Sequence, residues 1–331
     1  MSAKIKVAVI GAGGWGLQHV RVFSQLPDVE LCAVAGRSEA RTRARAEAFG
    51  LRPYLDFGEM LDTERPDLVS ISLPNQEHFA PTLQVIEHGT PLLVEKPLTF
   101  KLDEADALIA AAAQRKLFFA INFNHRYAQP VRMACQAITD GRVGEIVFAT
   151  WRFGGEGHST HPHANLIETQ CHGFDMLEHL CGPISAISAE MTDKTGGGFR
   201  TLVLSLRFAS GAVGSMLGSY DSSYAYPDTH RVEVNGTHGR VVIDDTVRRF
   251  EFQAVGNESA EVWQAGYFND RDRGFHATFD AHVVALLAAF RSGSPPPIHA
   301  RDGHRALALA HAAIESYETG RRVSTLRASA C

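Results

Sequence analysis

The stretch from Lys4 to Gly16, which reads K-I-K-V-A-V-I-G-A-G-G-W-G, constrains the fold of this chain more than any other. It begins with a short, mostly β-branched apolar run, which predicts a strand buried on both faces. Gly11, Gly13 and Gly16 follow at once in the spacing G-x-G-x-x-G, and the next residues recur at helical spacing. A strand, a glycine-rich turn and a helix in this order predict a parallel sheet that binds a dinucleotide.

Each of the three glycines has a physical task in such a turn. Gly11 allows the tight turn out of the strand, Gly13 lets a pyrophosphate approach the backbone, and Gly16 lets the helix pack closely on the strand. The N-terminus of the helix then offers free N–H groups to the phosphates. A glycine-rich turn without a ligand is the alternative interpretation. The cofactor-binding residues expected from this segment are Gly11, Gly13, Gly14, Trp15 and Gly16.

Length and charge limit the remaining possibilities. The chain has 331 residues and is 45% hydrophobic, which suggests about two domains with large cores. Its 37 acidic residues outnumber 32 lysines and arginines, which gives a formal charge of −5. This balance argues against a general nucleic-acid binder. No apolar run approaches the roughly 20 residues that span a membrane, so we expect no membrane partner.

The cysteines indicate the compartment. There are five, an odd number, and none forms a C-x-x-C pair. A disulfide framework is therefore not expected, and a reducing cytosol fits better. The N-terminus also lacks the apolar core and cleavage site of a signal peptide. We expect a cytoplasmic protein. The cysteines are Cys32, Cys135, Cys171, Cys181 and Cys331.

Strand-like and helix-like segments alternate in the first third of the chain, which predicts a parallel sheet with helices on both faces. Beyond Tyr127 the pattern changes, and strand candidates follow one another closely. Several of these alternate apolar and polar residues, as a half-exposed antiparallel sheet requires. We therefore expect two domains, 1–124 and 125–331. The expected strands are 5–10, 31–35, 68–72, 92–94, 117–121, 146–153, 184–191, 201–208, 212–217, 231–234 and 240–243, and the expected helices are 39–49, 76–88, 103–115, 130–138, 169–180, 275–291 and 302–317.

The end of the second expected strand selects the cofactor. An acidic residue there would bind the ribose 2′-OH and favour NAD, but the chain has Gly36, Arg37 and Ser38. Arg41 lies one helical turn further on. Arginine and serine are suited to a 2′-phosphate, so we expect NADP in preference to NAD. In the alternative interpretation Arg37 stacks on the adenine and the cofactor is NAD. The negative charge of Glu39, which begins the next helix, would disfavour a bound 2′-phosphate.

Two more strand ends carry polar or rigid residues. Leu73, Pro74 and Asn75 follow one strand, and Glu95-Lys96-Pro97 follows the next. In open α/β sheets ligands bind at the carboxyl ends of the strands, so these segments are expected at the same crevice. From the residues alone, a functional Lys96 and a surface ion pair of Glu95 remain equally open.

These motifs together resemble the Gfo/Idh/MocA oxidoreductases, a family that includes glucose–fructose oxidoreductase and inositol dehydrogenase. The resemblance covers nearly the whole chain. Its motifs are the G-x-G-x-x-G, Pro74-Asn75 with His78, Glu95-Lys96-Pro97, Asn122–Tyr127, His172-Gly173-Phe174-Asp175 and Asp302-Gly303 with Gly320.

The resemblance implies an α/β Rossmann domain followed by an α+β domain with a large open, mostly antiparallel sheet. It places the active site between the two domains and implies hydride transfer between NAD(P) and a carbinol carbon of a sugar or polyol. It also implies cofactor contacts from His78, Glu95, Lys96 and Asn124. Members often form dimers or tetramers through the open sheet, so we expect a homodimer or a homotetramer.

Hydride transfer from an alcohol needs a base for the hydroxyl proton and a donor for the developing alkoxide. In the family pattern the lysine matching Lys96 lies by the nicotinamide ribose and the substrate hydroxyl, and the histidine matching His172 is the general acid/base. Glu168 is the third expected catalytic residue, as a substrate ligand or as a group that orients His172, and relatives often have Asp at its position. It stands four residues before His172, and a continuous helix would place both on one face with Asp175. The alternative for His172 is a core histidine, and Asp175 is expected to have a structural role.

The segment Phe153–Asn165 is rich in glycine and histidine and precedes the expected catalytic helix, which indicates a substrate-facing loop or lid. His161 and His163 are expected to bind sugar hydroxyls. Their spacing to Cys171 and His172 is not that of common structural zinc sites, so no metal is expected. The substrate-binding residues predicted in total are Lys96, Tyr127, Trp151, Arg152, His161, His163, Glu168 and His172.

The function expected is therefore an NAD(P)-dependent oxidoreductase acting on a sugar, a sugar acid or a cyclic polyol. Two alternatives come from the same family. One is an NAD-dependent glycosidase-type enzyme, and the other is a non-catalytic NADP-binding regulator. The presence of both Lys96 and His172 favours the enzyme over the regulator.

Overall fold

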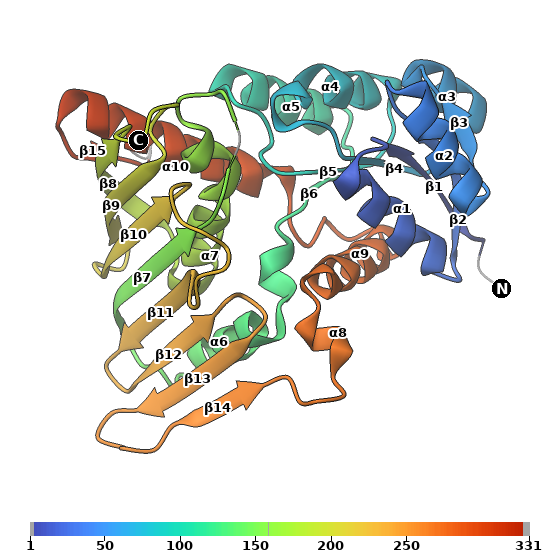
Figure 1. The fold of residues 1–331 in the computed structure, drawn as a ribbon. Coiled ribbons are helices and arrows are strands. Elements are labelled where there is room, and N and C mark those ends of the chain that lie inside the picture. Colours follow the sequence, from blue (N-terminus) through green and yellow to red (C-terminus); the bar gives the residue numbers. More distant parts are fainter. Residues whose placement is uncertain (1–2, 158, 327–331) are drawn as a thin grey trace. The chain divides into compact units, whose positions relative to one another are not determined.

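The computed structural model describes residues 3–157 and 159–326, so Cys331 lies outside the described residues (Figure 1). The chain forms two compact units. The first contains residues 1–122 and 280–304, and the second contains residues 123–279 and 305–331. The chain thus passes between the units three times, whereas the sequence analysis expected a single boundary at residue 124.

The first unit contains a six-stranded parallel sheet in the order β3-β2-β1-β4-β5-β6. The direction of strand progression reverses between β1 and β4, and such a switch point is where open α/β sheets bind ligands. Val7, Ala8 and Val9 in β1 are fully buried, as the apolar run predicts. The strands are β1 (Ile5–Ile10), β2 (Val29–Ala35), β3 (Arg52–Tyr54), β4 (Leu68–Ile71), β5 (Leu92–Val94) and β6 (Phe119–Ile121).

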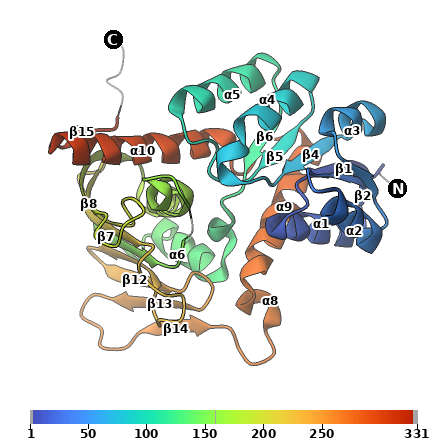
Figure 2. The same cartoon turned by 45° about the horizontal axis from the view of Figure 1, so that its top comes forward.

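Helices cover both faces of this sheet, with α4 and α5 on one side and α1 and α9 on the other (Figures 1 and 2). Residues 280–304 belong to the first unit and contact its earlier part in two places. Arg21 of α1 forms an ion pair with Asp280 of α9, and the Ile121 N–H donates to the Ile298 carbonyl at 3.2 Å. The helices are α1 (Gly14–Gln25), α2 (Glu39–Phe49), α3 (Phe57–Glu64), α4 (Phe79–His88), α5 (Leu102–Gln114) and α9 (Phe275–Ser292).

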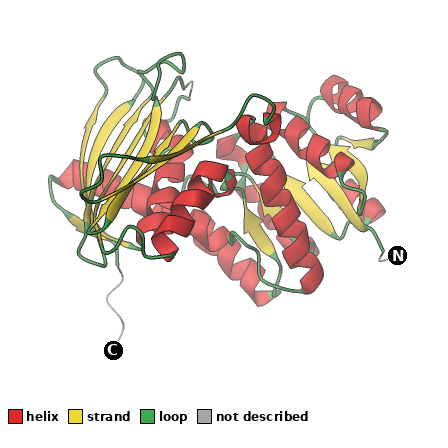
Figure 3. Cartoon of the chain, turned by 90° about the horizontal axis from the view of Figure 1, so that it is seen from below, coloured by secondary structure: helices red, strands yellow, loops and turns green. Residues whose placement is uncertain are grey.

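The second unit contains a nine-stranded mixed sheet in the order β14-β13-β12-β11-β7-β10-β9-β8-β15. Its pairs are antiparallel except for β7 with β10. Figure 3 shows this sheet and the first one in yellow, each with its helices in red. The strands are β7 (Ile146–Gly154), β8 (Ile184–Thr192), β9 (Thr201–Phe208), β10 (Val213–Ser219), β11 (His230–Gly236), β12 (Gly239–Asp244), β13 (Arg249–Ala254), β14 (Glu261–Gln264) and β15 (Val323–Ser324).

Helices α6 (Gln129–Thr139) and α7 (Cys171–Cys181) pack against one face of the larger sheet. Two further helices are α8 (Asp270–Arg273) and α10 (Ala300–Thr319). The alternation in β9 explains the two faces: Leu202, Leu204 and Leu206 are buried, and Val203 between them is 46% exposed. The predicted fold class, a Rossmann domain followed by a mostly antiparallel open sheet, is confirmed. β3, α3, β13, β14, α8 and β15 were not expected from the sequence.

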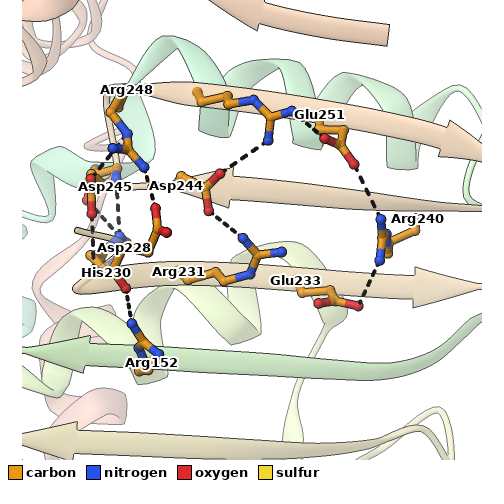
Figure 4. Close-up of polar contacts among 12 residues, drawn as sticks. Arg152, Asp228, His230, Arg231, Glu233, Arg240, Asp244, Asp245, Arg248 and Glu251 are labelled. Carbon is orange, nitrogen blue, oxygen red and sulfur yellow. Dashed lines mark hydrogen bonds and ion pairs between the residues drawn. The ribbon is translucent and has the colours of Figure 1, made fainter. Parts of the chain in front are cut away.

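The other face of the larger sheet carries a network of ion pairs across β11, β12 and β13 (Figure 4). Asp244 accepts from Arg231 at 2.7 Å and from Arg249 at 3.3 Å. Arg249 also pairs with Glu251, which accepts from Arg240 at 3.3 Å. Positive and negative side chains alternate along this network, so the charges of this surface largely balance.

No helix within residues 3–157 and 159–326 is both long enough and apolar enough to cross a lipid bilayer.

Candidate active site

A groove of about 470 Å³ lies at the carboxyl ends of the strands of the first unit. It is lined by three segments, which follow β1, β2 and β4. These are the positions predicted for the cofactor from the glycine motif and from two strand ends. The lining residues are Gly11, Ala12, Gly13, Gly14, Trp15, Gly16, Gly36, Arg37, Ser38, Arg41, Ser72, Leu73, Pro74 and Asn75.

The geometry of the glycines fits a dinucleotide. A Cβ at Gly11, whose φ is +125°, would lie 1.9 Å from the Ser72 carbonyl oxygen, and a Cβ at Gly16 would lie 2.0 Å from the Gly11 oxygen. Both positions therefore need glycine for packing. By contrast, a Cβ at Gly13 or Gly14 would meet nothing within 4 Å, so these residues open the backbone to the groove. A pyrophosphate can approach such a bare helix N-terminus.

The segment after β2 brings positive charge to the groove. Arg37, Ser38 and Arg41 line it together, as predicted for the end that would hold a 2′-phosphate. The neighbouring Glu39 pairs with Arg43 one turn along α2, at 2.9 Å, so its charge is compensated by its own helix. Arg37 itself pairs with Glu77 at 2.9 Å.

Three residues predicted to contact the cofactor are buried and do not line this groove. The ring nitrogens of His78 lie 2.7 and 3.0 Å from the Pro97 and Leu73 carbonyl oxygens, and burial lowers the pKa of His78. Asn124 donates to Thr278 at 2.7 Å within the second unit. Glu95 belongs to a buried network. Because His78 contacts both Leu73 and Pro97, it connects the loop that follows β4 with the loop that follows β5.

The buried network in the first unit centres on the Glu95 carboxylate. Oε1 accepts from Asn122 Nδ2 at 2.7 Å and lies 2.9 Å from His19 Nε2. His19 Nδ1 reaches Ser70 at 2.6 Å, and His282 donates from Nδ1 to Asn122 at 2.8 Å. The network thus joins α1, β4, the end of β5, the end of β6 and α9.

The electrostatics of Glu95 follow from this network. Burial alone would raise its pKa, but the hydrogen bond and charge of His19, the hydrogen bond from Asn122 and the charge of Lys96 together hold the pKa below its usual value. Glu95 is therefore a buried carboxylate rather than a surface group. Lys96 follows it directly, half-buried, and the Lys96–Pro97 peptide bond is cis.

His172 lies in the first turn of α7 and is only 6% exposed. Its ring stacks on the ring of His125, with centroids 3.9 Å apart and an interplanar angle of 4°, and the edge of Phe123 packs against it at 5.8 Å. The sequence analysis missed His125. The signal in the sequence is its place inside Asn122–Tyr127, a stretch that resembles the family.

Two contacts set the position of α7. Asp175 accepts two hydrogen bonds from the Arg126 guanidinium, from Nε at 3.0 Å and from an η nitrogen. Gly173 packs on Trp151, because a Cβ there would lie 2.6 Å from the indole nitrogen. Asp175 thus holds the helix that carries His172, which is one of the structural roles expected for it.

Glu168 does not lie on the same α-helix as His172. It belongs to a π-helical turn, Asn165–Thr169, and α7 begins only at Cys171. The spacing of four residues therefore does not place the two side chains on one α-helical face. Glu168 accepts from the Ser159 hydroxyl at 3.0 Å, so it contacts the preceding loop.

Trp151 and Arg152 were both expected to line a pocket, but neighbouring residues of a strand point to opposite faces. Trp151 is buried beneath α7 and donates to Gln170 at 2.8 Å. Arg152 is exposed on the opposite face of the sheet, beside Asp228 (Figure 4). Burial raises the pKa of Tyr127, which is half-buried.

The segment Phe153–Asn165, apart from residue 158, is held by backbone hydrogen bonds and ring contacts. The Gly155 N–H donates to the Ser219 carbonyl at 2.9 Å, and a Cβ at Gly155 would collide with the Tyr224 ring. His163 stacks on Phe199 with centroids 4.9 Å apart, and its backbone N–H donates to His161 Nδ1 at 3.2 Å. Burial lowers the pKa of both histidines.

Two family models match the chain and together cover most of it. The model described as "Oxidoreductase family, NAD-binding Rossmann fold" (GFO_IDH_MocA) matches residues 5–123. The model for the "Oxidoreductase family, C-terminal alpha/beta domain" matches residues 129–325.

Named relatives are similar over nearly their whole length. A myo-inositol 2-dehydrogenase of Thermotoga maritima is 24% identical, over 96% of this chain and 98% of that protein. A D-xylose 1-dehydrogenase (NADP(+)) of Haloferax volcanii is also 24% identical, over 95% and 98%. Among solved structures, levoglucosan dehydrogenase in complex with NADH and levoglucosan superposes with a TM-score of 0.87 at 19% identity, over 98% of this chain and all of that chain.

Proposed function

The chain belongs to the Gfo/Idh/MocA oxidoreductase family, and on that premise we propose that it transfers a hydride between a nicotinamide cofactor and a carbinol or carbonyl carbon of a sugar, a sugar acid or a cyclic polyol. The observation that carries this proposal is the groove in the first unit. Its lining combines the open backbone of Gly13 and Gly14 with the positive charge of Arg37 and Arg41. The substrate class follows from the names of relatives such as the inositol and xylose dehydrogenases.

NADP is the proposed cofactor, in preference to NAD. Gly13 and Gly14 would hold the pyrophosphate, and Arg37, Ser38 and Arg41 would hold the 2′-phosphate. Arginine suits this task because its guanidinium matches phosphate geometry with paired donors. When bound, the cofactor supplies the nicotinamide that accepts or donates the hydride.

Lys96 and His172 are the proposed proton-handling residues. A lysine ammonium can donate to a developing alkoxide, and an imidazole can take up or release the proton near neutral pH. His172 is suited to this role because its ring is fixed by His125 and its helix by Arg126 and Asp175. Glu168, Tyr127, His161 and His163 remain proposed substrate contacts.

A homodimer or homotetramer formed through the open sheet is also proposed. The face that carries the ion-pair network in Figure 4 has balanced charge, and it also exposes Val203, Val213, Leu217 and Phe148. A face that combines exposed apolar side chains with balanced charge suits an isologous interface, in which the same surface of two copies meets. A cytoplasmic location is proposed because the cysteines among the described residues, Cys32, Cys135, Cys171 and Cys181, are all free thiols.

A substrate screen tests the proposal. Sugars, inositols and sugar acids are offered with NADP or with NAD, and the absorbance of the reduced nicotinamide is followed. Reduction of NADP by at least one polyol or sugar is expected. A cofactor that co-purifies and never turns over while a glycosidic bond is cleaved would instead indicate the glycosidase-type reaction.

A further inference from the structure

Arg37 and Glu77 form an ion pair at the groove. Their side chains lie 2.9 Å apart, and they are 73% and 43% exposed. Arg37 follows β2, and Glu77 ends the 3₁₀ turn Asn75–Glu77 that follows β4. β2 and β4 are the two neighbours of β1 in the sheet, so the pair joins the two segments on either side of the glycine-rich turn.

The partner of Arg37 matters because this guanidinium is the group proposed to bind a 2′-phosphate. NADP differs from NAD only in that phosphate, a dianion or nearly so at neutral pH. To bind it, Arg37 must exchange the Glu77 carboxylate for the phosphate. Any Glu77 charge that stays nearby repels the phosphate.

Glu39, the acidic residue that follows Ser38, does not act in this way. Its carboxylate forms an ion pair at 2.9 Å with Arg43, which lies one turn further along the same helix. Among the described residues, Glu77 is thus the carboxylate that forms an ion pair with Arg37 at the groove.

We infer that Glu77 is a specificity-determining residue for the cofactor, which weakens NADP binding by competing for Arg37 and leaves NAD binding unaffected. This inference rests on the proposed function, because it assumes that a dinucleotide binds in the groove. Exposed ion pairs are weak, so the competition is modest and a phosphate dianion overcomes it. Glu77 would therefore reduce the ratio of NADP affinity to NAD affinity, but NADP would still bind more tightly than NAD.

The test compares Glu77→Gln with Glu39→Gln, a matched control that removes the same charge from the neighbouring helix. Calorimetric titration measures the dissociation constants of adenosine 2′,5′-bisphosphate and of AMP, two ligands that differ only in the 2′-phosphate. We expect Glu77→Gln to tighten binding of the bisphosphate by about two- to fivefold at low salt, with AMP binding unchanged. High salt should reduce this gain, because screening weakens exposed charges. Glu39→Gln should change neither constant.

A double variant, Arg37→Ala with Glu77→Gln, should show no gain over Arg37→Ala alone. The inference is overturned if Glu77→Gln leaves the bisphosphate constant unchanged, if it shifts both ligands alike, or if Glu39→Gln gives the same gain. Failure of the proposed NADP preference has a different signature: wild-type protein would bind AMP and the bisphosphate equally, and Arg37→Ala would weaken both to the same extent. Because both glutamates lie on the surface, thermal unfolding is expected to confirm that the variants remain folded.

Discussion

The imidazole rings of His125 and His172 lie face to face, with centroids 3.9 Å apart and planes within 4° of parallel. The rings of Phe275 and His230 pack edge-on against His125 at 5.4 and 5.8 Å, and His125 is only 3% exposed. This stack fixes the plane of the His172 ring. A group that transfers a proton depends on such fixed orientation.

Replacing His125 should therefore impair turnover through the position of His172. His125→Ala removes the ring and should lower kcat roughly 10- to 100-fold with a smaller effect on KM, as expected when a reacting group is misplaced. His125→Phe retains a flat ring and should restore most of the rate. Steady-state kinetics of both variants provides the measurement. If Phe rescues no better than Ala, orientation by the ring is not what His125 contributes.

Lys96→Ala and His172→Ala should each lower turnover by about 10²- to 10⁴-fold, the range for removing a group that transfers or stabilises a proton. Cofactor binding should change little, because the proposed phosphate contacts at Gly13, Gly14, Arg37 and Arg41 are unchanged in both variants. Lys101→Ala serves as the control, since this exposed lysine forms an ion pair with the nearby Glu104 at 3.1 Å. Kinetics together with cofactor titration decides the outcome, and near-wild-type rates would remove the residue concerned from the mechanism.

The sequence predicted the features of the fold that depend on local pattern. The buried run of β1, the glycine spacing after it and the alternation in β9 each follow from strand or turn geometry, and each is observed. β3 escaped prediction because Arg52–Tyr54 is short, partly exposed and contains a proline. The π-helical turn at Glu168 escaped because α and π turns differ in hydrogen-bond register, which side-chain pattern does not reveal.

Contacts between residues far apart in the chain could not be predicted from the sequence. The return of Asp280–His304 to the first unit depends on pairs such as Ile121 with Ile298 and Asn122 with His282, which are far apart in sequence. The stacking of His125 on His172 joins residues from a 3₁₀ turn and a helix in the same way. The sequence placed the groove-lining residues because each stands at a strand end, where topology alone brings them together.

The Glu95 network makes a prediction about stability. Glu95→Gln should lower the free energy of unfolding by about 3 kcal/mol at pH 7, because it leaves His19 and Asn122 with a poorer buried partner. The folded-state pKa lies below the ordinary value of 4.5, so the stabilisation is present above that value and is lost as the pH falls through the folded-state pKa.

Urea unfolding of both proteins between pH 7 and pH 3 tests this. The difference between wild type and Glu95→Gln should shrink toward the acid end. Glu87→Gln, on the exposed side of α4, is the control and should unfold like wild type throughout. A gap that stays constant down to pH 3 would mean that the charge of Glu95 does not contribute.

His230 gives a pH dependence in a higher window. Burial lowers its pKa to about 3, and its Nδ1 accepts a hydrogen bond from the Thr246 N–H at 3.1 Å, so the folded protein holds the ring neutral. The unfolded chain binds a proton near the ordinary value of 6.5. Between these values the unfolded state binds more protons than the folded state, so stability falls as the pH is lowered from 6.5 toward 3.

His230→Gln keeps an acceptor for the Thr246 N–H but cannot take up a proton. Its free energy of unfolding should consequently decline less steeply than that of wild type as the pH is lowered from 6.5 to 4. Denaturant unfolding at several pH values measures the two slopes, and His238→Gln, at an exposed position between β11 and β12, should keep the wild-type slope. Equal slopes for His230→Gln and wild type would show that His230 is protonated alike in the folded and unfolded states, and that its burial does not make the protein sensitive to acid.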